Sequence, residues 1–303
     1  MSFSLDVLRG SIAIPMTPFD ENGRIDVSVL EEEIEFCVES GTTGICVPIM
    51  VSEFETLSEE ERKLMVRVSV EVSNGRVPII ANCAANNIPL AIEYAEYFEK
   101  IGADAVMAMP PYLMKADFKT IYNYYKAISN AVSTPIMLQN SSNDNVAISD
   151  EQVVKICEEI DRINWIKEEK PPSPESVSNL VSKRSPSIRG VFSGLGGLYL
   201  FTERERGAKG IIVACQFCDV LQKIWNLMDE GAETEAVELW ERLLPAIVLE
   251  RLFEQTFMKE IMIRRGIFKN RNNRLSTKPL SKSDMAEIDR VWERIEPILV
   301  WRK

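Results

Sequence analysis

The stretch "INWIKEE" at 163–169 places a lysine among apolar neighbours and then two glutamates, and the spacing of Lys167 and Glu169 could support imine chemistry. Side chains at i and i+2 share a face of a strand, so Lys167 and Glu169 would point one way and Ile166 and Glu168 the other. A lysine in apolar surroundings is costly to keep charged, and the neutral amine attacks ketones to give a Schiff base. An ion pair between Lys167 and Glu169 that only stiffens the structure is an equally good interpretation from position alone.

The chain contains no histidine among its 303 residues, and this excludes several kinds of active site. Ser-His-Asp and Cys-His catalytic sites cannot form, and neither can the common zinc sites. Acid–base steps therefore have to use Lys, Glu, Asp, Tyr or Cys. Because an imine-forming lysine supplies its own electron sink, we expect neither a metal nor an organic cofactor.

Six cysteines are spread through probable strands and helices, and two of them form the CxxC pattern "CQFC". No second pair accompanies this pattern, so core packing is favoured over metal binding or redox work. We interpret all six as reduced, buried thiols of a cytoplasmic protein. They are Cys37, Cys46, Cys83, Cys157, Cys215 and Cys218.

The bulk composition indicates one large domain, or one domain with an appendage, because 46% of the residues are hydrophobic. The net charge of −11 argues against nucleic acid and anionic membrane surfaces as partners. No apolar run approaches the ~18 residues that a membrane span needs. The first residues form a poor signal peptide, because no basic stretch precedes a long apolar core.

Short β-branched runs alternate with amphipathic segments along the chain. Eight strands alternating with helices predict a parallel sheet that closes into a (β/α)8 TIM barrel of the α/β class. An open doubly wound sheet is the alternative, which the lack of a GxGxxG turn after the first strand weakens. The predicted strands cover 11–19, 44–50, 77–84, 104–111, 134–140, 163–169, 188–194 and 209–215.

After Gly231 the pattern is helical only, so we expect a barrel domain over 1–231 and a C-terminal helical extension over 232–303. The extension carries more apolar surface than an exposed helical pair would leave in water, which predicts a homo-oligomer. Packing of this surface on the chain's own barrel is the alternative. The apolar stripe consists of Trp240, Leu243, Leu244, Val248, Leu252 and Phe253.

Helix starts are marked by polar residues at several places. Ser58 with Glu61 makes a capping box. Ser173, followed by Pro174, is predicted to be an N-cap with proline at the first helical position.

Six short motifs occur in order at the spacing expected of barrel strands and loops. They are "PMTPFDENGRID", "SEFETLSEEER", "ANCAANNIPLAIEYA", "MPPYLMK", "WIKEE" and "VFSGLGG". Together they resemble the dihydrodipicolinate synthase / N-acetylneuraminate lyase family of class I aldolases and dehydratases, from about Ile12 to Glu296. The resemblance implies a TIM barrel, Lys167 as the Schiff-base lysine, a 2-keto acid substrate and a tetramer.

The sequence departs from the family pattern in the groups that usually relay protons. The family tyrosine on the fifth strand is replaced by Gln139, which cannot take a proton near neutral pH. The second tyrosine of the usual proline–tyrosine–tyrosine run is Leu113, leaving Tyr112. After the second strand, the usual glycine, two Thr or Ser, glycine and glutamate are here Ile49, Met50, Val51, Ser52 and Glu53. These departures argue against dihydrodipicolinate synthesis and sialic acid cleavage.

The combination of Gln139 with Lys167 and Glu169 is more similar to the branch that contains 2-keto-3-deoxy-L-arabonate dehydratase. In that branch the glutamate two residues after the lysine can move protons. We therefore expect an imine on Lys167 that acidifies C3 of a 2-keto-3-deoxy sugar acid, followed by loss of the C4 hydroxyl. Glu169, with a water or Tyr112, is the candidate base and acid.

Several residues are candidates for binding the substrate, each with a structural alternative. Gln139 would hydrogen-bond the substrate, or it is a satisfied polar core residue. Ser52, with backbone N–H groups such as that of Val51, would hold the carboxylate, or Ser52 caps the following helix. Asn82 would narrow the pocket or bond the substrate.

Two glycines after the predicted seventh strand, Gly194 and Gly196, are the remaining candidates. They would allow close backbone approach, or they form a tight turn.

Two other functions remain open from the sequence. An aldolase of the same family would break the C3–C4 bond and release pyruvate plus an aldehyde. A barrel that binds a 2-keto acid without turnover, or that only scaffolds an assembly, would not need Lys167 and Glu169 on one face.

Overall fold

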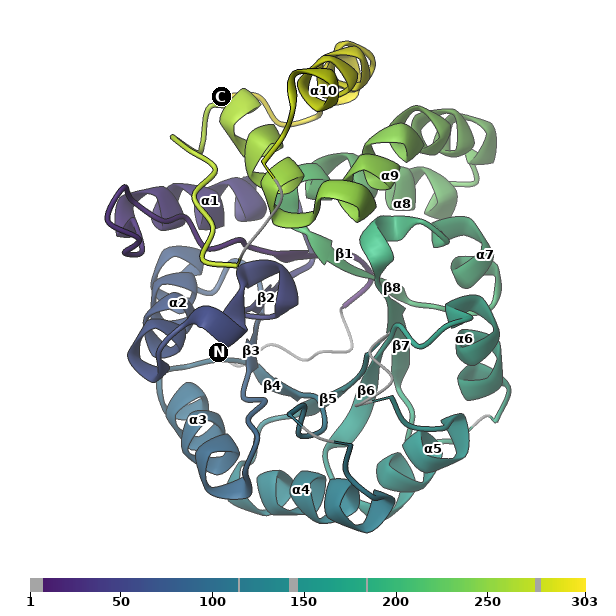
Figure 1. The fold of residues 1–303 in the computed structure, drawn as a ribbon. Coiled ribbons are helices and arrows are strands. Elements are labelled where there is room, and N and C mark those ends of the chain that lie inside the picture. The colour runs from purple at the N-terminus through teal and green to yellow at the C-terminus, as the bar shows by residue number, and fades with distance from the viewer. Residues whose placement is uncertain (1–7, 114, 142–146, 184, 276–278) are drawn as a thin grey trace. The chain divides into compact units, whose positions relative to one another are not determined.

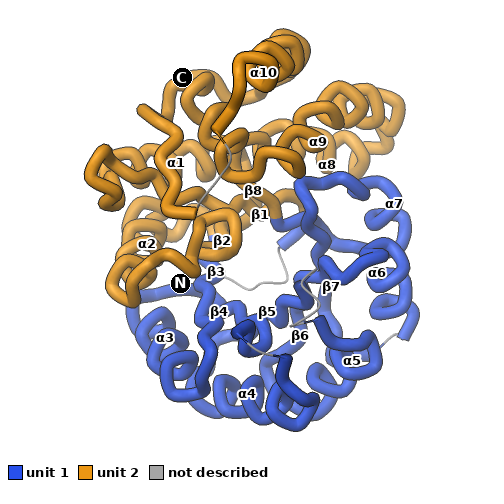
Figure 2. The backbone as a smooth tube through the Cα atoms, viewed as in Figure 1, with its two compact units in different colours: residues 1–9, 78–212 blue, residues 10–77, 213–303 orange. Residues whose placement is uncertain are grey.

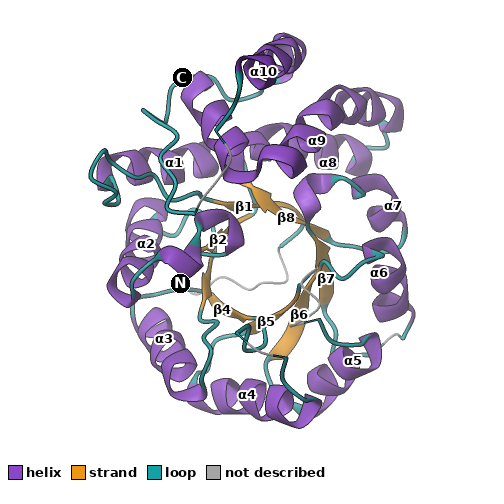
Figure 3. Ribbon diagram, viewed as in Figure 1, coloured by secondary structure: helices purple, strands orange, loops and turns teal. Residues whose placement is uncertain are grey.

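The computed structural model describes residues 8–113, 115–141, 147–183, 185–275 and 279–303. Its eight strands pair in chain order as a closed barrel, with helices between successive strands (Figures 1 and 3). The predicted TIM barrel with C-terminal helices is thereby confirmed. The strands are β1 (Gly10–Ile14), β2 (Gly44–Val47), β3 (Ile79–Asn82), β4 (Ala105–Ala108), β5 (Ile136–Asn140), β6 (Ile163–Glu168), β7 (Gly190–Ser193) and β8 (Gly210–Ala214).

Contacts divide the chain into two compact units, residues 1–9 with 78–212 (unit 1) and residues 10–77 with 213–303 (unit 2), as Figure 2 shows. Within the described ranges no helix combines the length and apolarity needed to cross a membrane. The boundary predicted between 231 and 232 stays a prediction.

Unit 1 holds the strands from β3 to β7, which pair in parallel with their neighbours. Its helices lie on the outer face of these strands (Figure 1). Side-chain caps begin three of them, at Asn87, Asp117 and Ser149. The helices are α3 (Ile88–Lys100), α4 (Phe118–Ala131), α5 (Asp150–Glu159), α6 (Ser173–Ser182) and α7 (Leu200–Glu205), with the 3-10 turn η4 (Leu195–Gly197).

Unit 2 holds β1, β2 and the long C-terminal helices, with α8 packed on both β1 and α9 and with α10 packed on α9. Strand β1 ends at Ile14, earlier than predicted, because Pro15 and Pro18 have no N–H to continue a ladder. The helices are α1 (Val27–Glu39), α2 (Glu59–Ser73), α8 (Cys218–Asp229), α9 (Glu233–Arg264) and α10 (Lys282–Ile295), with η2 (Met50–Ser52), η3 (Phe54–Thr56), η5 (Cys215–Phe217) and η6 (Glu296–Ile298).

A completely buried ion pair ties α9 to the turn that follows β2. Lys259 Nζ lies 2.7 Å from Glu53 Oε1, and both side chains are 0% exposed. Lys259 also donates to Asn272 O, while Glu53 Oε2 accepts from the Arg274 and Leu275 backbone N–H groups. Glu53 itself adopts a left-handed conformation with φ of 54°. The pair therefore fixes three segments of unit 2 together.

Replacing Lys259 by methionine is expected to lower the free energy of unfolding by about 3–5 kcal/mol, because Glu53 keeps a buried charge without its counter-ion. Urea denaturation measures this. The control is Lys269→Met, since the Lys269 side chain is 66% exposed and loss of its pair with Asp26 should cost under about 1 kcal/mol. Equal stability losses in the two variants would contradict the prediction.

All six cysteines are buried and free of disulfides, as predicted. Cys37, Cys215 and Cys218 lie close together beside Glu33, which is 0% exposed. Glu33 Oε1 accepts from Met16 N–H at 2.8 Å and from Cys215 Sγ at 3.1 Å. Burial raises the pKa of Glu33 from 4.5 to about 8. The folded protein thus carries a neutral carboxylic acid near pH 7.

Glu33→Gln is expected to flatten the dependence of stability on pH. The folded pKa lies above the unfolded one, so the stability contributed by protonated Glu33 is complete below pH 4.5 and is lost as the pH rises through 8. Glutamine accepts the same two bonds and does not titrate. Its advantage over wild type should grow between these limits by at most about 1.4 kcal/mol per pH unit.

Urea unfolding at pH 5, 6.5 and 8 measures this effect, with the exposed Glu31→Gln on the same helix as control. Parallel pH profiles of wild type and Glu33→Gln would show that Glu33 is not protonated in the fold.

Candidate active site

Lys167 and Glu169 lie together at the end of β6, as their spacing predicts. Lys167 Nζ is 3.1 Å from Glu169 Oε2, and the two side chains are 3% and 14% exposed. Glu168, between them, turns the other way and accepts hydrogen bonds from Asn140 Nδ2 and the Lys170 N–H. The alternation along the strand therefore places one carboxylate against the lysine and the other away from it.

Gln139 joins this pair from the neighbouring strand. In the parallel register of β5 and β6, Gln139 stands opposite Lys167. Its Nε2 donates to Glu169 Oε2 at 3.2 Å, and the residue is 1% exposed. The same carboxylate oxygen thus receives both the ammonium and the amide. Lysine, glutamate and glutamine form one buried cluster.

Because Gly194 has no side chain, the Glu169 side chain can lie directly against its backbone. A Cβ built on Gly194 would lie 2.2 Å from Glu169 Oε1 and 2.7 Å from its Cδ, closer than atoms can approach. Gly196 has a different reason to be glycine, because its φ is 69° inside the η4 turn. The geometry therefore supports close approach at Gly194 and a tight turn at Gly196.

Behind β6, Glu168 and Asn140 form a second buried polar group that sequence reasoning missed. The Asn140 side chain bonds both the N–H and the C=O of Ile148. These bonds tie the last residue of β5 to the segment just before α5. Burial raises the pKa of Glu168 to about 7, although the Asn140 amide and Lys170 lower it. This pair fixes the strand from which Lys167 projects. Two adjacent polar residues at the end of a buried strand, Gln139 and Asn140, could have indicated a polar group on each side of β5.

Asn82 and Tyr112 also belong to unit 1. Asn82 is the last residue of β3, 1% exposed, and its Oδ1 accepts from Ala84 N–H. Tyr112 follows β4, and its backbone N–H donates to Asn86 Oδ1. Their contacts with a substrate stay predictions.

Ser52 and Val51 belong to unit 2, in the η2 turn after β2. The Ser52 hydroxyl donates to Pro15 O at 2.6 Å and accepts from Ile49 N–H at 3.2 Å, and the residue is 0% exposed. Its one proton is thus engaged by the backbone, in line with a local structural use. Binding of a carboxylate by Ser52 or Val51 stays a prediction.

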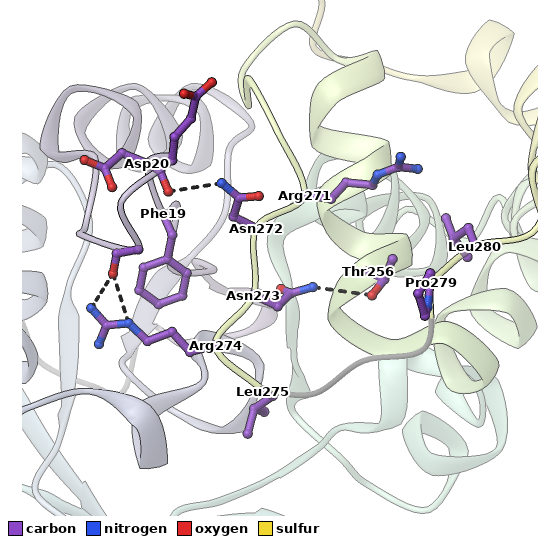
Figure 4. A pocket seen from close by; sticks show the side chains of 12 residues that line it. Phe19, Asp20, Thr256, Arg271, Asn272, Asn273, Arg274, Leu275, Pro279 and Leu280 are labelled. Atoms are coloured by element: carbon purple, nitrogen blue, oxygen red, sulfur yellow. Dashed lines mark hydrogen bonds between the residues drawn. The ribbon is translucent and has the colours of Figure 1, made fainter.

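A cavity of about 580 Å³ in unit 2 lies between the loop after β1 and the segment before α10 (Figure 4). Its two arginines are already paired. Arg274 reaches past Phe19 to the Gly23 carbonyl and binds Glu61, while Arg271 binds Glu260. None of the predicted site residues is among those that line it, so its size does not make it the reaction site.

Comparison with known proteins decides the family. The model of the dihydrodipicolinate synthetase family matches residues 7–294, nearly the whole chain. The chain belongs to this family. Members of the dihydrodipicolinate synthetase family are lyases, aldolases and dehydratases.

Individual relatives span the chain at modest identity. The L-2-keto-3-deoxyarabonate dehydratase of Azospirillum brasilense is 24% identical over 96% of both chains. The 4-hydroxy-tetrahydrodipicolinate synthase of Bacillus subtilis (strain 168) is 30% identical over 81% of this chain and 84% of its own. The structure of that synthase from Methylacidiphilum fumariolicum SolV superposes with a TM-score of 0.87, at 26% identity over 96% of both chains.

Proposed function

We propose that the protein forms a Schiff base between a 2-keto acid and Lys167, and that it dehydrates a 2-keto-3-deoxy sugar acid. The observation that carries this is the buried cluster of Lys167, Glu169 and Gln139. A buried lysine, 3% exposed, beside a carboxylate supports this proposal, because it pairs the amine that forms an imine with a group that can move protons. Family membership and the dehydratase relative from Azospirillum brasilense support the same chemistry.

The reaction begins when neutral Lys167 Nζ attacks C2 of the keto acid. The carbinolamine hydroxyl takes a proton from solvent and leaves as water, and the protonated imine that results withdraws electrons from C3. Glu169, 3.1 Å from Nζ, accepts the C3 proton, and the electron pair of that bond enters the enamine. The C4 hydroxyl then leaves as water, taking a proton from Glu169. Hydrolysis of the imine releases the product and restores the lysine.

Gln139 positions rather than transfers protons, since an amide does not ionise in this range. Its Nε2 holds Glu169 Oε2 in the free enzyme and would turn toward the substrate or keep the carboxylate oriented. Tyr112 and Asn82 are proposed to approach the substrate from the ends of β4 and β3. Ser52 and Val51 remain candidates for its carboxylate.

Product analysis distinguishes this reaction from its alternatives. Nuclear magnetic resonance of mixtures with a panel of 2-keto-3-deoxy acids should show loss of water with the carbon chain intact. Appearance of pyruvate plus an aldehyde would identify an aldolase instead. Absence of any product, with binding retained, would identify a barrel that binds a keto acid without turnover.

Assembly into a homo-oligomer, a tetramer by family resemblance, stays a proposal. Val248 and Leu252, one turn apart on α9, are 56% and 66% exposed. Leu243, from the same predicted stripe, is completely buried within its own chain. The stripe thus divides between an internal packing face and an exposed face, and we propose that the exposed face contacts a second copy.

A further inference from the structure

Glu203 is a buried carboxylate of unit 1 that the proposed chemistry does not use. It lies on α7, is 1% exposed, and accepts a hydrogen bond from Ser173 Oγ at 2.7 Å. Burial raises the pKa of Glu203, and the hydroxyls of Ser173 and Ser193 lie close enough to lower it. Charge interactions act as well, since nearby Glu169 raises the pKa of Glu203 and Arg206 lowers it.

The two serines next to Glu203 belong to the segments that enclose Glu169. Ser173 closes the short segment that runs from Glu169 through two prolines to α6. Ser193 ends β7 and directly precedes Gly194, the residue whose backbone lies against the Glu169 carboxylate. Glu203 is therefore tied through Ser173 to the segment that leads away from Glu169, and it lies near Ser193 on the segment at the other side of Glu169.

The bond from Ser173 replaces a helix cap. The sequence predicted Ser173 as the N-cap of α6, but the helix begins at Ser173 after Pro172 and has no side-chain cap. The hydroxyl points to Glu203 instead. Because an N-cap hydrogen bond commonly stabilises a helix, Ser173 forgoes a favourable local contact and bonds this carboxylate instead.

We propose that Glu203 is a positioning residue for the reaction, holding Glu169 in the geometry that proton transfer needs. The proposal rests on the proposed function, because it assigns Glu203 to the same site. Misplacing a catalytic group by about 1 Å can cost on the order of 10²-fold in rate. An anchor of this kind affects kcat more than binding of the keto acid or imine formation.

Kinetics of three single variants and one double variant test the proposal. Glu203→Ala is expected to lower kcat by about 10–100-fold, while KM and borohydride trapping of the imine change little. Glu203→Gln keeps an oxygen for Ser173 Oγ and should retain most of the activity. Ser173→Ala removes the same bond from the other end, so it should reproduce the fall in kcat even if Glu203→Ala does not fold. The double variant should be no slower than the slower single one.

Glu99→Ala is the matched structural control. Glu99 is also a carboxylate that anchors a serine, Ser133, in the same unit. It should lose stability but keep kcat. If Glu203→Ala and Ser173→Ala behave like this control, Glu203 is only an anchor for α7 and the proposal is overturned while the Schiff-base function stands. If wild type neither traps nor converts any 2-keto acid, the proposed function fails first and the role of Glu203 fails with it.

Discussion

Lys167→Arg is expected to lower kcat by about 10⁵–10⁶-fold, the scale of loss when a covalent nucleophile is removed. Arginine keeps the positive charge beside Glu169, but its guanidinium stays protonated and forms no imine. The variant should therefore fold without an unpaired Glu169 and still be inactive. Steady-state kinetics on the best substrate of the panel measure the effect.

The neighbouring Lys170→Arg is the control, because Lys170 pairs with Asp150 away from the cluster and its replacement should leave kcat near wild type. Lys167→Arg activity above about a hundredth of wild type would show that no covalent step depends on this lysine, given the scale of such losses.

Glu169→Gln is expected to lower kcat by about 10²–10⁴-fold, which is the usual rate enhancement from one positioned acid–base group. The amide keeps the shape and can still accept from Lys167, but it cannot carry the C3 proton. Imine formation should persist, so borohydride trapping of the keto acid should remain efficient in this variant. The result separates proton transfer from formation of the covalent intermediate.

Glu168→Gln makes the same change one residue earlier on the opposite face, and we expect kcat to change little. A Glu169→Gln enzyme with full turnover would assign the proton to another group, with Tyr112 or water next to be tested. A variant that unfolds would instead make the Lys167–Glu169 pair a structural one.

The core of the site could be predicted because it depends on local geometry. Alternation along one strand is enough to place Lys167 and Glu169 on one side and Glu168 on the other. A second kind of alternation, that of strand and helix patterns along the chain, predicted the barrel, because a parallel sheet needs helical crossovers.

The remaining features depend on tertiary contacts that spacing does not reveal. The bond from Gln139 to Glu169 requires the β5–β6 register, which only the folded sheet defines. The use of Ser173 by Glu203 overrides a strong local signal for an N-cap. The break inside α9 at Glu254, with φ of 49°, likewise has no counterpart in the helical pattern.

The most direct test of the central claim is reduction of the wild-type enzyme with borohydride in the presence of pyruvate or a 2-keto-3-deoxy acid, followed by peptide mass spectrometry. The account predicts one adduct, on the peptide that contains Lys167, and none when the keto acid is omitted. An adduct on any other lysine, or no adduct with any keto acid, would contradict it.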